Sequence, residues 1–233
     1  MKSYKAYIFD MDGTVLNTLD DLSDALNYAL GACGHRHDLT AAETGMLFGS
    51  GVTVAVSRAL AYEMGYPLMD LIQIGTEEDA ISPLLDSSEI SRIEEVYRPY
   101  YEAHCTDKTA PYPGIPEAVR RLRSAGILTA VVSNKPDGAV QMLVKDMFDG
   151  LFDFSLGEKK GVARKPAPDM VRSCFEALGV SAEEAVYIGD SEIDLETAAR
   201  GGLDCIAVTW GFRSREFLKS LGAKTLIDSP DQL

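Results

Sequence analysis

Two aspartates near the start of the chain have a spacing that suits chemistry. The apolar residues 7–9 run directly into residues 10–14, which read Asp-Met-Asp-Gly-Thr. Because side chains at i and i+2 of an extended chain point to the same side, Asp10 and Asp12 are expected to share one face. Carboxylates this close repel each other, which favours a bound cation or a retained proton. One could attack an electrophile while the other transfers a proton; a simple Asp-Gly turn is the alternative.

Further polar residues stand at the ends of predicted strands or in a loop before a predicted helix. They are Ser133, Asn134, Lys165, Asp190 and Asp194. In a doubly wound parallel sheet, ligands bind at the carboxyl ends of the strands, so these residues are expected to gather around Asp10 and Asp12. Acidic oxygens suit a hard cation, most simply Mg²⁺, and a lysine with a Ser-Asn turn suits a phosphoryl group. This combination describes phosphoryl transfer through an aspartyl phosphate.

The elements that must position these residues fall into two sets. The first is helical: apolar residues recur at helical spacing, and Thr40 with Glu43 is typical of a capping box. The predicted helices of this set cover residues 19–32, 52–64 and 88–104, with another beginning at Thr40 and ending at the Gly-Ser-Gly of 49–51. Nearly everything from residue 19 to about 105 is therefore expected to be helical.

In the second set, after residue 111, helices and strands alternate. The predicted helices are 115–125, 137–146, 169–178, 193–200 and 214–221, and the predicted strands are 128–132, 152–155, 185–188, 205–208 and 225–227. Alternation with solidly apolar strands indicates an α/β fold with a doubly wound parallel sheet, and the strand before Asp10 belongs to it. We therefore predict a Rossmann-like core of residues 1–16 and 107–233, with residues 17–106 inserted as an all-helical cap domain.

Composition limits the partners. The 233 residues carry a formal net charge of −14, with 46% hydrophobic and 25% charged residues. This acidity argues against nucleic acid and against anionic membrane surfaces, since both require a basic footprint. No stretch approaches the roughly 20 apolar residues of a membrane span. The expected partner is a small phosphorylated metabolite, bound where the site is locally positive.

The cysteines and the N-terminal residues bear on the cellular compartment in which the protein is expected. Cys33, Cys105, Cys174 and Cys205 form no CxxC motif, so we expect them to be reduced and mostly buried. The apolar run before Asp10 is too short for a signal peptide. We therefore expect a cytoplasmic protein, either a monomer or a homodimer.

Four short motifs follow one another along the chain. They are residues 10–14 (DMDGT), residues 132–134 (VSN), Lys165-Pro166, and Gly189-Asp190 with Asp194. In this order, with a strand before three of them, the set resembles the haloacid-dehalogenase-like (HAD) hydrolases, and most closely their phosphoglycolate-phosphatase branch. The resemblance covers essentially the whole chain. It implies a Mg²⁺-dependent phosphatase that acts on a small phosphomonoester, with 2-phosphoglycolate as the first candidate.

The resemblance also implies a role for each motif residue. Asp10 would be the nucleophile and a metal ligand, and Asp12 would be the general acid/base, with its backbone carbonyl reaching the metal. The phosphoryl oxygens would be held by Ser133 and the amide of Asn134. Lys165 would neutralise the phosphoryl group and Asp10. Asp190 would bind Mg²⁺ directly, and Asp194 would bind it either directly or through a water molecule.

Several of these residues also allow a simpler interpretation. Ser133, Asn134 and Asp190 could cap the helices that follow them, and Asp194 could be a first-turn acid favoured by the helix dipole. Gly13 and Thr14 are expected to shape the turn and support Asp12. Lys135 lies one step past its motif and is expected to face solvent, and Arg164 is a doubtful participant.

The predicted cap helps to choose between activities. No lysine occurs between Lys5 and Lys108, which disfavours the family's phosphonoacetaldehyde hydrolases and sugar phosphomutases, and the presence of Asp12 disfavours a dehalogenase. The turn at 48–51 resembles a substrate-contacting cap loop, but it could be a plain helix–helix turn. We interpret Arg58 and Arg98 as solvated surface residues rather than carboxylate ligands.

Three functions therefore stay open. The first is phosphomonoester hydrolysis, and the second is an inorganic pyrophosphatase of the same branch. The third is a phospho-acceptor signalling module similar to receiver domains, which also combine Asp, Mg²⁺, Ser/Thr and Lys on a doubly wound sheet. An acceptor on the first strand, an acid/base at Asp12 and an inserted lid favour turnover over a long-lived phosphoryl group.

Overall fold

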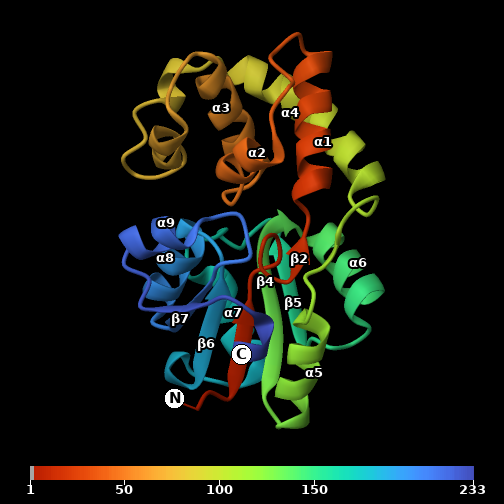
Figure 1. Ribbon diagram of the computed structural model, residues 1–233, viewed down its shortest axis with the longest axis vertical. Helices are drawn as coiled ribbons and strands as arrows, with labels where there is room; N and C mark the ends of the chain where they lie inside the picture. The colour runs from red at the N-terminus through yellow and green to blue at the C-terminus, as the bar shows by residue number, and fades with distance from the viewer. Residues whose placement is uncertain (1–2) are drawn as a thin grey trace. The chain divides into compact units, whose positions relative to one another are not determined.

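A six-stranded parallel sheet forms the centre of the catalytic part of the chain. The computed structural model describes residues 3–233, and its sheet has the strand order β5-β4-β1-β6-β7-β8 with parallel pairing throughout (Figure 1). The strands are β1 (Ala6–Phe9), β4 (Leu128–Pro136), β5 (Phe154–Glu158), β6 (Ala185–Gly189), β7 (Asp204–Val208) and β8 (Thr225–Ile227). The predicted doubly wound α/β fold is thereby confirmed, with β1 in the interior of the sheet.

Both faces of the sheet are covered by helices because its strands are apolar on both sides. Phe9, Val131 and Ile188 pack on one face beneath α5 and α6, whereas Ile8 and Ala130 pack on the other beneath α7 and α8. The helices of this unit are α5 (Ile115–Ser124), α6 (Asp137–Phe148), α7 (Asp169–Leu178), α8 (Glu192–Gly201) and α9 (Arg215–Ser220). A central strand that is buried on both faces holds the start of the 10–14 motif rigidly.

The chain separates into two compact units. One contains the chain up to Asn17 together with Ala110–Leu233, and the other is Thr18–Thr109. The short strands β2 (Leu16–Asn17) and β3 (Ala110–Pro111) pair antiparallel at the two crossings between the units. The insertion therefore begins and ends at one place in the sheet unit.

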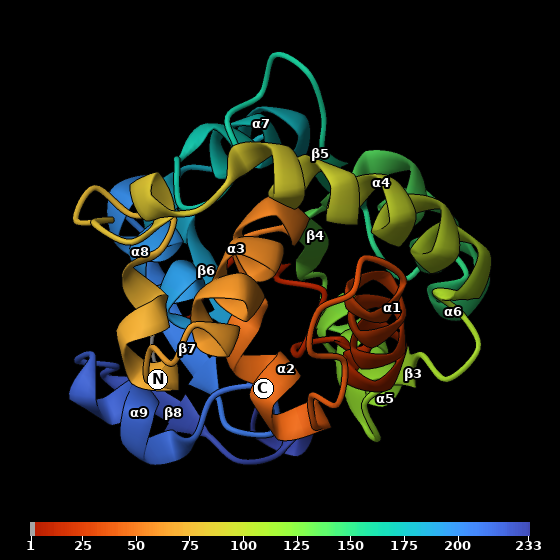
Figure 2. The ribbon, with the colours of Figure 1, turned by 90° about the horizontal axis from the view of Figure 1, so that it is seen from above.

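The inserted unit is helical. Its α-helices are α1 (Leu19–Ala32), α2 (Ala41–Leu47), α3 (Val52–Glu63) and α4 (Ser87–His104), and its 3₁₀ helices are η1 (Leu68–Gln73) and η2 (Ser82–Leu84). Figures 1 and 2 show α1 lying beside α4, where Tyr28 and Tyr100 stack with ring centroids 4.0 Å apart. The predicted capping box is present, with Thr40 and Glu43 each satisfying the other's backbone amide. Within the unit, the Asp21 carboxylate also accepts hydrogen bonds from the amides of Lys108 and Thr109.

Two strands, β4 and β5, differ from the prediction by more than one residue at an end. The strand predicted over 128–132 continues to Pro136, and the strand predicted over 152–155 is β5, which begins at Phe154. The pairing explains the first difference, because four residues of β4 after Val132 lie opposite only two of β5. A bulge of this kind is not encoded in hydrophobic periodicity.

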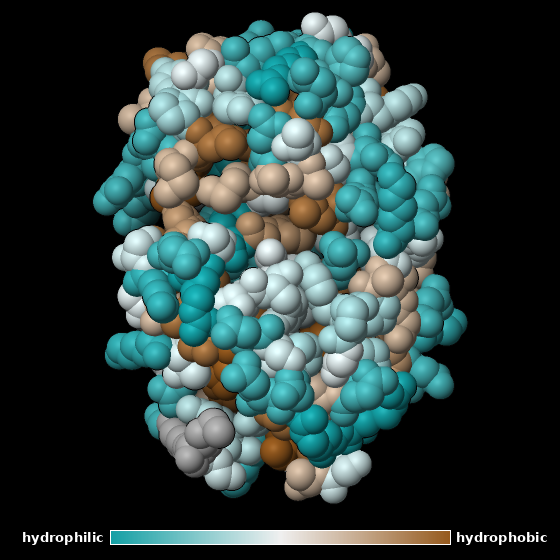
Figure 3. Space-filling view, in the orientation of Figure 1, coloured by the Kyte–Doolittle hydropathy of each residue, from teal (hydrophilic) through white to brown (hydrophobic). Residues whose placement is uncertain are grey.

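The face of the sheet unit seen in Figure 3 is mostly polar, most strongly over α5. Among the described residues, no helix has both the length and the apolar character that spanning a membrane would require.

Candidate active site

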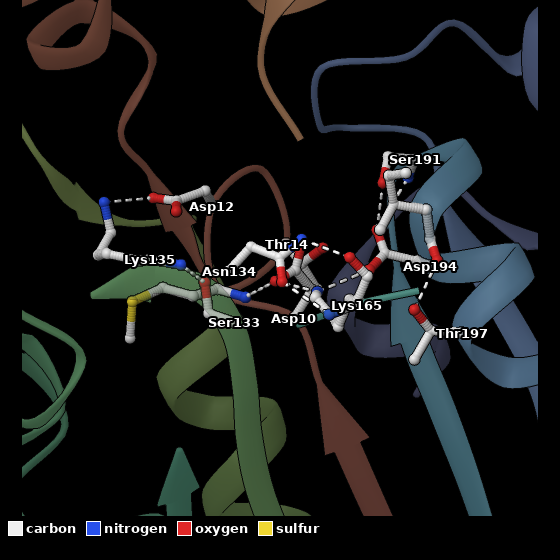
Figure 4. Close-up of polar contacts among 12 residues, drawn as sticks. Asp10, Asp12, Thr14, Ser133, Asn134, Lys135, Lys165, Ser191, Asp194 and Thr197 are labelled. Carbon is white, nitrogen blue, oxygen red and sulfur yellow. Dashed lines mark hydrogen bonds and ion pairs between the residues drawn. The ribbon is translucent and has the colours of Figure 1, made fainter. Parts of the chain in front are cut away.

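The carboxyl ends of β1, β4 and β6 bring most of the predicted site residues together, but the Asp12 carboxylate points away from Asp10 and toward Lys135, contrary to the expectation that the two aspartates share one face (Figure 4). Asp10 follows β1, Ser133 and Asn134 lie in the last part of β4, and Asp190 follows β6. The remaining site residues enter from two other elements. Lys165 enters from the loop before α7, and Asp194 lies in the first turn of α8. The sheet thus joins residues that are up to about 180 positions apart, as expected for a switch point of a doubly wound sheet.

A buried lysine links two of the acids. The Lys165 ammonium lies 2.7 Å from Asp10 Oδ1 and 3.0 Å from Asp194 Oδ1. Its side chain is only 1% exposed. Burial opposes the charge on Lys165, but the carboxylates of Asp10 and Asp194 outweigh burial and raise the pKa of the lysine well above its usual range. Lys165 is therefore a fixed, buried cation at the nucleophile candidate.

Asp190 is held by donors on both carboxylate oxygens. Thr14 Oγ1 donates to Oδ1 at 3.0 Å, and the amide of Phe212 donates to Oδ2 at 2.7 Å. Burial, and then the nearby Asp194 carboxylate, raise the pKa of Asp190 from 3.8 to about 7. The side chain does not cap α8, because the N-cap residue is Ser191. Thr14 supports Asp190, and the expectation that it supports Asp12 is not met.

Asp194 is fully occupied by hydrogen bonds. Its Oδ2 accepts from the amides of Asp190 and Ser191 at 3.1 Å each and from Ser191 Oγ at 2.6 Å. Its Oδ1 accepts from Lys165 at 3.0 Å and from the Tyr187 hydroxyl at 3.2 Å. One oxygen therefore caps α8 and the other orients the lysine. Asp194 is the first-turn capping acid of α8 and also a partner of Lys165.

The site has an excess of buried negative charge. Asp10, Asp190 and Asp194 each offer an oxygen within 4.8 Å of the others, and all three are buried. Burial, together with the neighbouring acids, raises the pKa of Asp10 well above its usual range. Arg213 lies nearby and is paired with Glu192 at 2.7 Å, and Lys165 contacts two of the three acids directly. Buried carboxylates in excess over cations require either protons or a metal ion.

The end of β4 clamps the lysine loop. Asn134 accepts from the Lys165 amide at 2.9 Å and donates to the Lys165 carbonyl at 3.0 Å. Ser133 Oγ accepts from the amide of Lys135 at 3.1 Å, which leaves its hydroxyl proton for another acceptor. The Asn134 side chain therefore fixes Lys165, a role that its sequence context did not indicate.

Lys135 is not solvent facing, contrary to expectation. Its side chain is 3% exposed, and its ammonium lies 3.0 Å from Asp12 Oδ1. The bulge in β4 explains the difference, because Ser133, Asn134 and Lys135 are all buried where a regular strand would alternate.

Sequence reasoning missed three features of this site. Tyr187 lies within β6, fully buried, and its hydroxyl accepts from Lys165 at 2.9 Å. The amide of Phe212 and the glycine before it were also not singled out. A Cβ on Gly211 would lie 2.4 Å from Asp190 Cβ, so only glycine lets this loop approach the acid. A tyrosine inside an otherwise aliphatic strand was the one available signal.

In the helical unit, one interpretation is wrong. Arg58 is fully buried, and its guanidinium donates to the carbonyls of Leu47, Ile72 and Ile74 at 3.2 Å each. A guanidinium with five donors can join chain segments in this way. Arg98 is a surface residue as predicted, paired with Glu94 across one helical turn.

Comparison with known proteins identifies the family to which the chain belongs. The family model for haloacid dehalogenase-like hydrolases matches residues 7–208. Phosphoglycolate phosphatases of Rhodospirillum rubrum and Mesorhizobium japonicum are 32% and 31% identical, over 96% and 89% of this chain and 87% and 84% of their own. The chain belongs to the haloacid dehalogenase-like hydrolases, as the motifs predicted, and it is a phosphatase of that family.

Solved structures agree in fold. A candidate phosphoglycolate phosphatase from Lactobacillus delbrueckii subsp. bulgaricus superposes with a TM-score of 0.97 at 52% identity, covering 99% of this chain and 97% of that one. CbbY from Rhodobacter sphaeroides, solved in complex with phosphate, has a TM-score of 0.73 at 26% identity, with coverage of 99% and 96%. These similarities extend over both units of the chain.

Proposed function

We propose that this protein is a Mg²⁺-dependent phosphatase that hydrolyses a small phosphomonoester through an aspartyl phosphate on Asp10. The observation that carries the proposal is the buried group of Asp10, Asp190 and Asp194 around the ammonium of Lys165. A divalent cation held by these acids would balance the remaining negative charge, and together with Lys165 it would offset the charge of a phosphoryl group at Asp10.

The donor set suits a hard cation. All side-chain candidates are carboxylates, and oxygen ligands are what Mg²⁺ prefers. We assign Asp10 and Asp190 as direct side-chain ligands, together with the backbone carbonyl of Asp12. Asp194 is assigned an indirect role because both its oxygens are already engaged. When bound, Mg²⁺ would neutralise charge on the phosphoryl oxygens as a Lewis acid.

The chain's own residues divide the reaction between them. A carboxylate oxygen of Asp10 attacks phosphorus, the bond to the leaving oxygen breaks, and protonated Asp12 gives its proton to that oxygen. Ser133 and the amide of Asn134 hold the phosphoryl oxygens, and Lys165 offsets their charge. Asp12 then removes a proton from water, which attacks phosphorus and releases inorganic phosphate and Asp10.

We propose 2-phosphoglycolate as the substrate because the curated relatives with about 30% identity carry that activity in their names. The helical unit, residues 18–109, is proposed to act as the cap that selects the leaving group. The resemblance of the 48–51 turn to a substrate loop is part of this proposal, and Ser50 within it is buried.

The experiment is phosphate release from 2-phosphoglycolate, pyrophosphate and p-nitrophenyl phosphate, with Mg²⁺ and with a chelator, for wild type and Asp10→Asn. We expect chelator-sensitive turnover of 2-phosphoglycolate and a loss of about 10⁴-fold or more in Asp10→Asn, since removing a nucleophile leaves only binding effects. Turnover that persists in Asp10→Asn would refute the mechanism.

The same panel distinguishes the alternatives. Preference for pyrophosphate would assign a pyrophosphatase, and activity on the aryl phosphate alone would remove the substrate assignment while leaving the chemistry of Asp10 in place. A phospho-Asp10 that persists for minutes with no turnover would favour a signalling role.

A further inference from the structure

Each member of the Asp10/Asp12 pair has its own lysine. Lys165 lies 2.7 Å from Asp10, and Lys135 lies 3.0 Å from Asp12. Figure 4 shows the Asp12 carboxylate turned toward Lys135 and away from Asp10. Two like charges that would otherwise share one face of the chain are therefore drawn to separate cations.

The backbone that carries Lys135 is fixed on several sides. Its amide donates to Ser133 Oγ at 3.1 Å, and Asp137 Oδ1 accepts from the Gly157 amide at 2.7 Å. A Cβ on Gly157 would lie 2.6 Å from the Lys135 carbonyl oxygen, so β5 approaches this bend closely only because it has glycine there. The backbone at Lys135 is thereby fixed, and burial and the contact with Asp12 place its ammonium beside the site.

We propose that Lys135 is a positioning residue for Asp12: it holds the carboxylate in one orientation so that proton transfer occurs from a fixed place. The proposal rests on the proposed function, in which Asp12 serves both as acid and as base. Lys135 makes no covalent bond and transfers no proton. It acts through Asp12, because misplacing a catalytic group by about 1 Å can cost about 100-fold in rate.

This role predicts that loss of Lys135 affects the formation and the hydrolysis of phospho-Asp10 differently. Formation of phospho-Asp10 from p-nitrophenyl phosphate needs little proton donation, because nitrophenolate is a good leaving group. Hydrolysis of phospho-Asp10 needs Asp12 as a base. This step is therefore slowed when the Asp12 carboxylate is misplaced. A lysine that merely bound the phosphoryl group or supported the fold would affect both steps.

The test is rapid-quench measurement of the two steps in full-length Lys135→Met, in Lys135→Arg and in the control Lys159→Met, which changes an exposed lysine. For Lys135→Met we expect formation within about threefold of wild type and hydrolysis slowed roughly tenfold to 100-fold. Lys135→Arg keeps the cation and should recover most of the hydrolysis rate, and it remains informative if Lys135→Met does not fold.

A double-mutant cycle completes the test. If Lys135 acts through Asp12, adding Lys135→Met to Asp12→Asn should lower the rate by less than about threefold, because the target is already gone. Equal slowing of both steps, additive effects, or an unchanged hydrolysis rate in Lys135→Met would each overturn the inference. Failure of the proposed function is seen separately, as a wild type that forms no phosphoenzyme on Asp10.

Discussion

The surroundings of Asp190 predict how the free energy of unfolding of the metal-free protein depends on pH. The carboxyl is 1% exposed and lies near Asp194, and its pKa is raised from 3.8 to about 7. A raised carboxyl pKa means that the folded, metal-free protein keeps a proton that the unfolded chain loses. Stability from this group is therefore present at low pH and decreases as the pH rises from about 4 to about 7. The difference between the two pKa values corresponds to about 4 kcal/mol.

The perturbation is Asp190→Asn, which removes the charge and keeps the shape. Any constant cost of the new amide beside the Phe212 N–H is the same at every pH, so the change with pH reports the charge of Asp190 together with its coupling to the neighbouring carboxylates. Linkage predicts that the variant gains roughly 2–3 kcal/mol over metal-free wild type between about pH 5 and about pH 8. For a chain of this size that corresponds to roughly 5–10 °C in Tm.

The assay is thermal unfolding with a chelator across this pH range, repeated with Mg²⁺. Magnesium should raise the Tm of wild type more at about pH 8 than at about pH 5, because protons compete for Asp190, and it should have little effect on Asp190→Asn. A variant-minus-wild-type difference that stays flat with pH would refute the reasoning, since Asp190 would then titrate alike in both states.

Two other substitutions test side chains that hold loops in place, one in the sheet unit and one in the helical unit. Asn134→Ala should lower kcat roughly tenfold, because the Lys165 loop loses both of its side-chain hydrogen bonds; steady-state kinetics would check this, and an unchanged kcat would show that the clamp is dispensable. Arg58→Met should destabilise the helical unit by about 2–4 kcal/mol, because three carbonyls lose their buried donor. Urea unfolding would measure the loss, with the exposed Arg98→Met as the matched control, and equal stability of the two variants would contradict the argument.

Local sequence determined the elements and their order with good accuracy. The helix over 19–32, the helix over 169–178 and the strand over 225–227 have the predicted bounds, because each has a clear apolar period and a Gly or polar end. The sheet followed from strand–helix alternation, and the sheet in turn explains why Asp10, Asn134 and Asp190 meet at one edge. These inferences need only neighbouring residues and general topology.

Only the tertiary structure decided the partners of side chains that bond to residues distant in the sequence. Lys135 turns inward because β4 bulges against β5, and buried Arg58 is satisfied by three carbonyl groups from two separate segments. Thr14 contacts Asp190 rather than its neighbour Asp12 for the same reason, since the 10–14 turn packs against the end of β6. Hydrogen bonds between residues distant in the sequence depend on how loops approach one another, and residue types and spacing along a single chain do not specify that geometry.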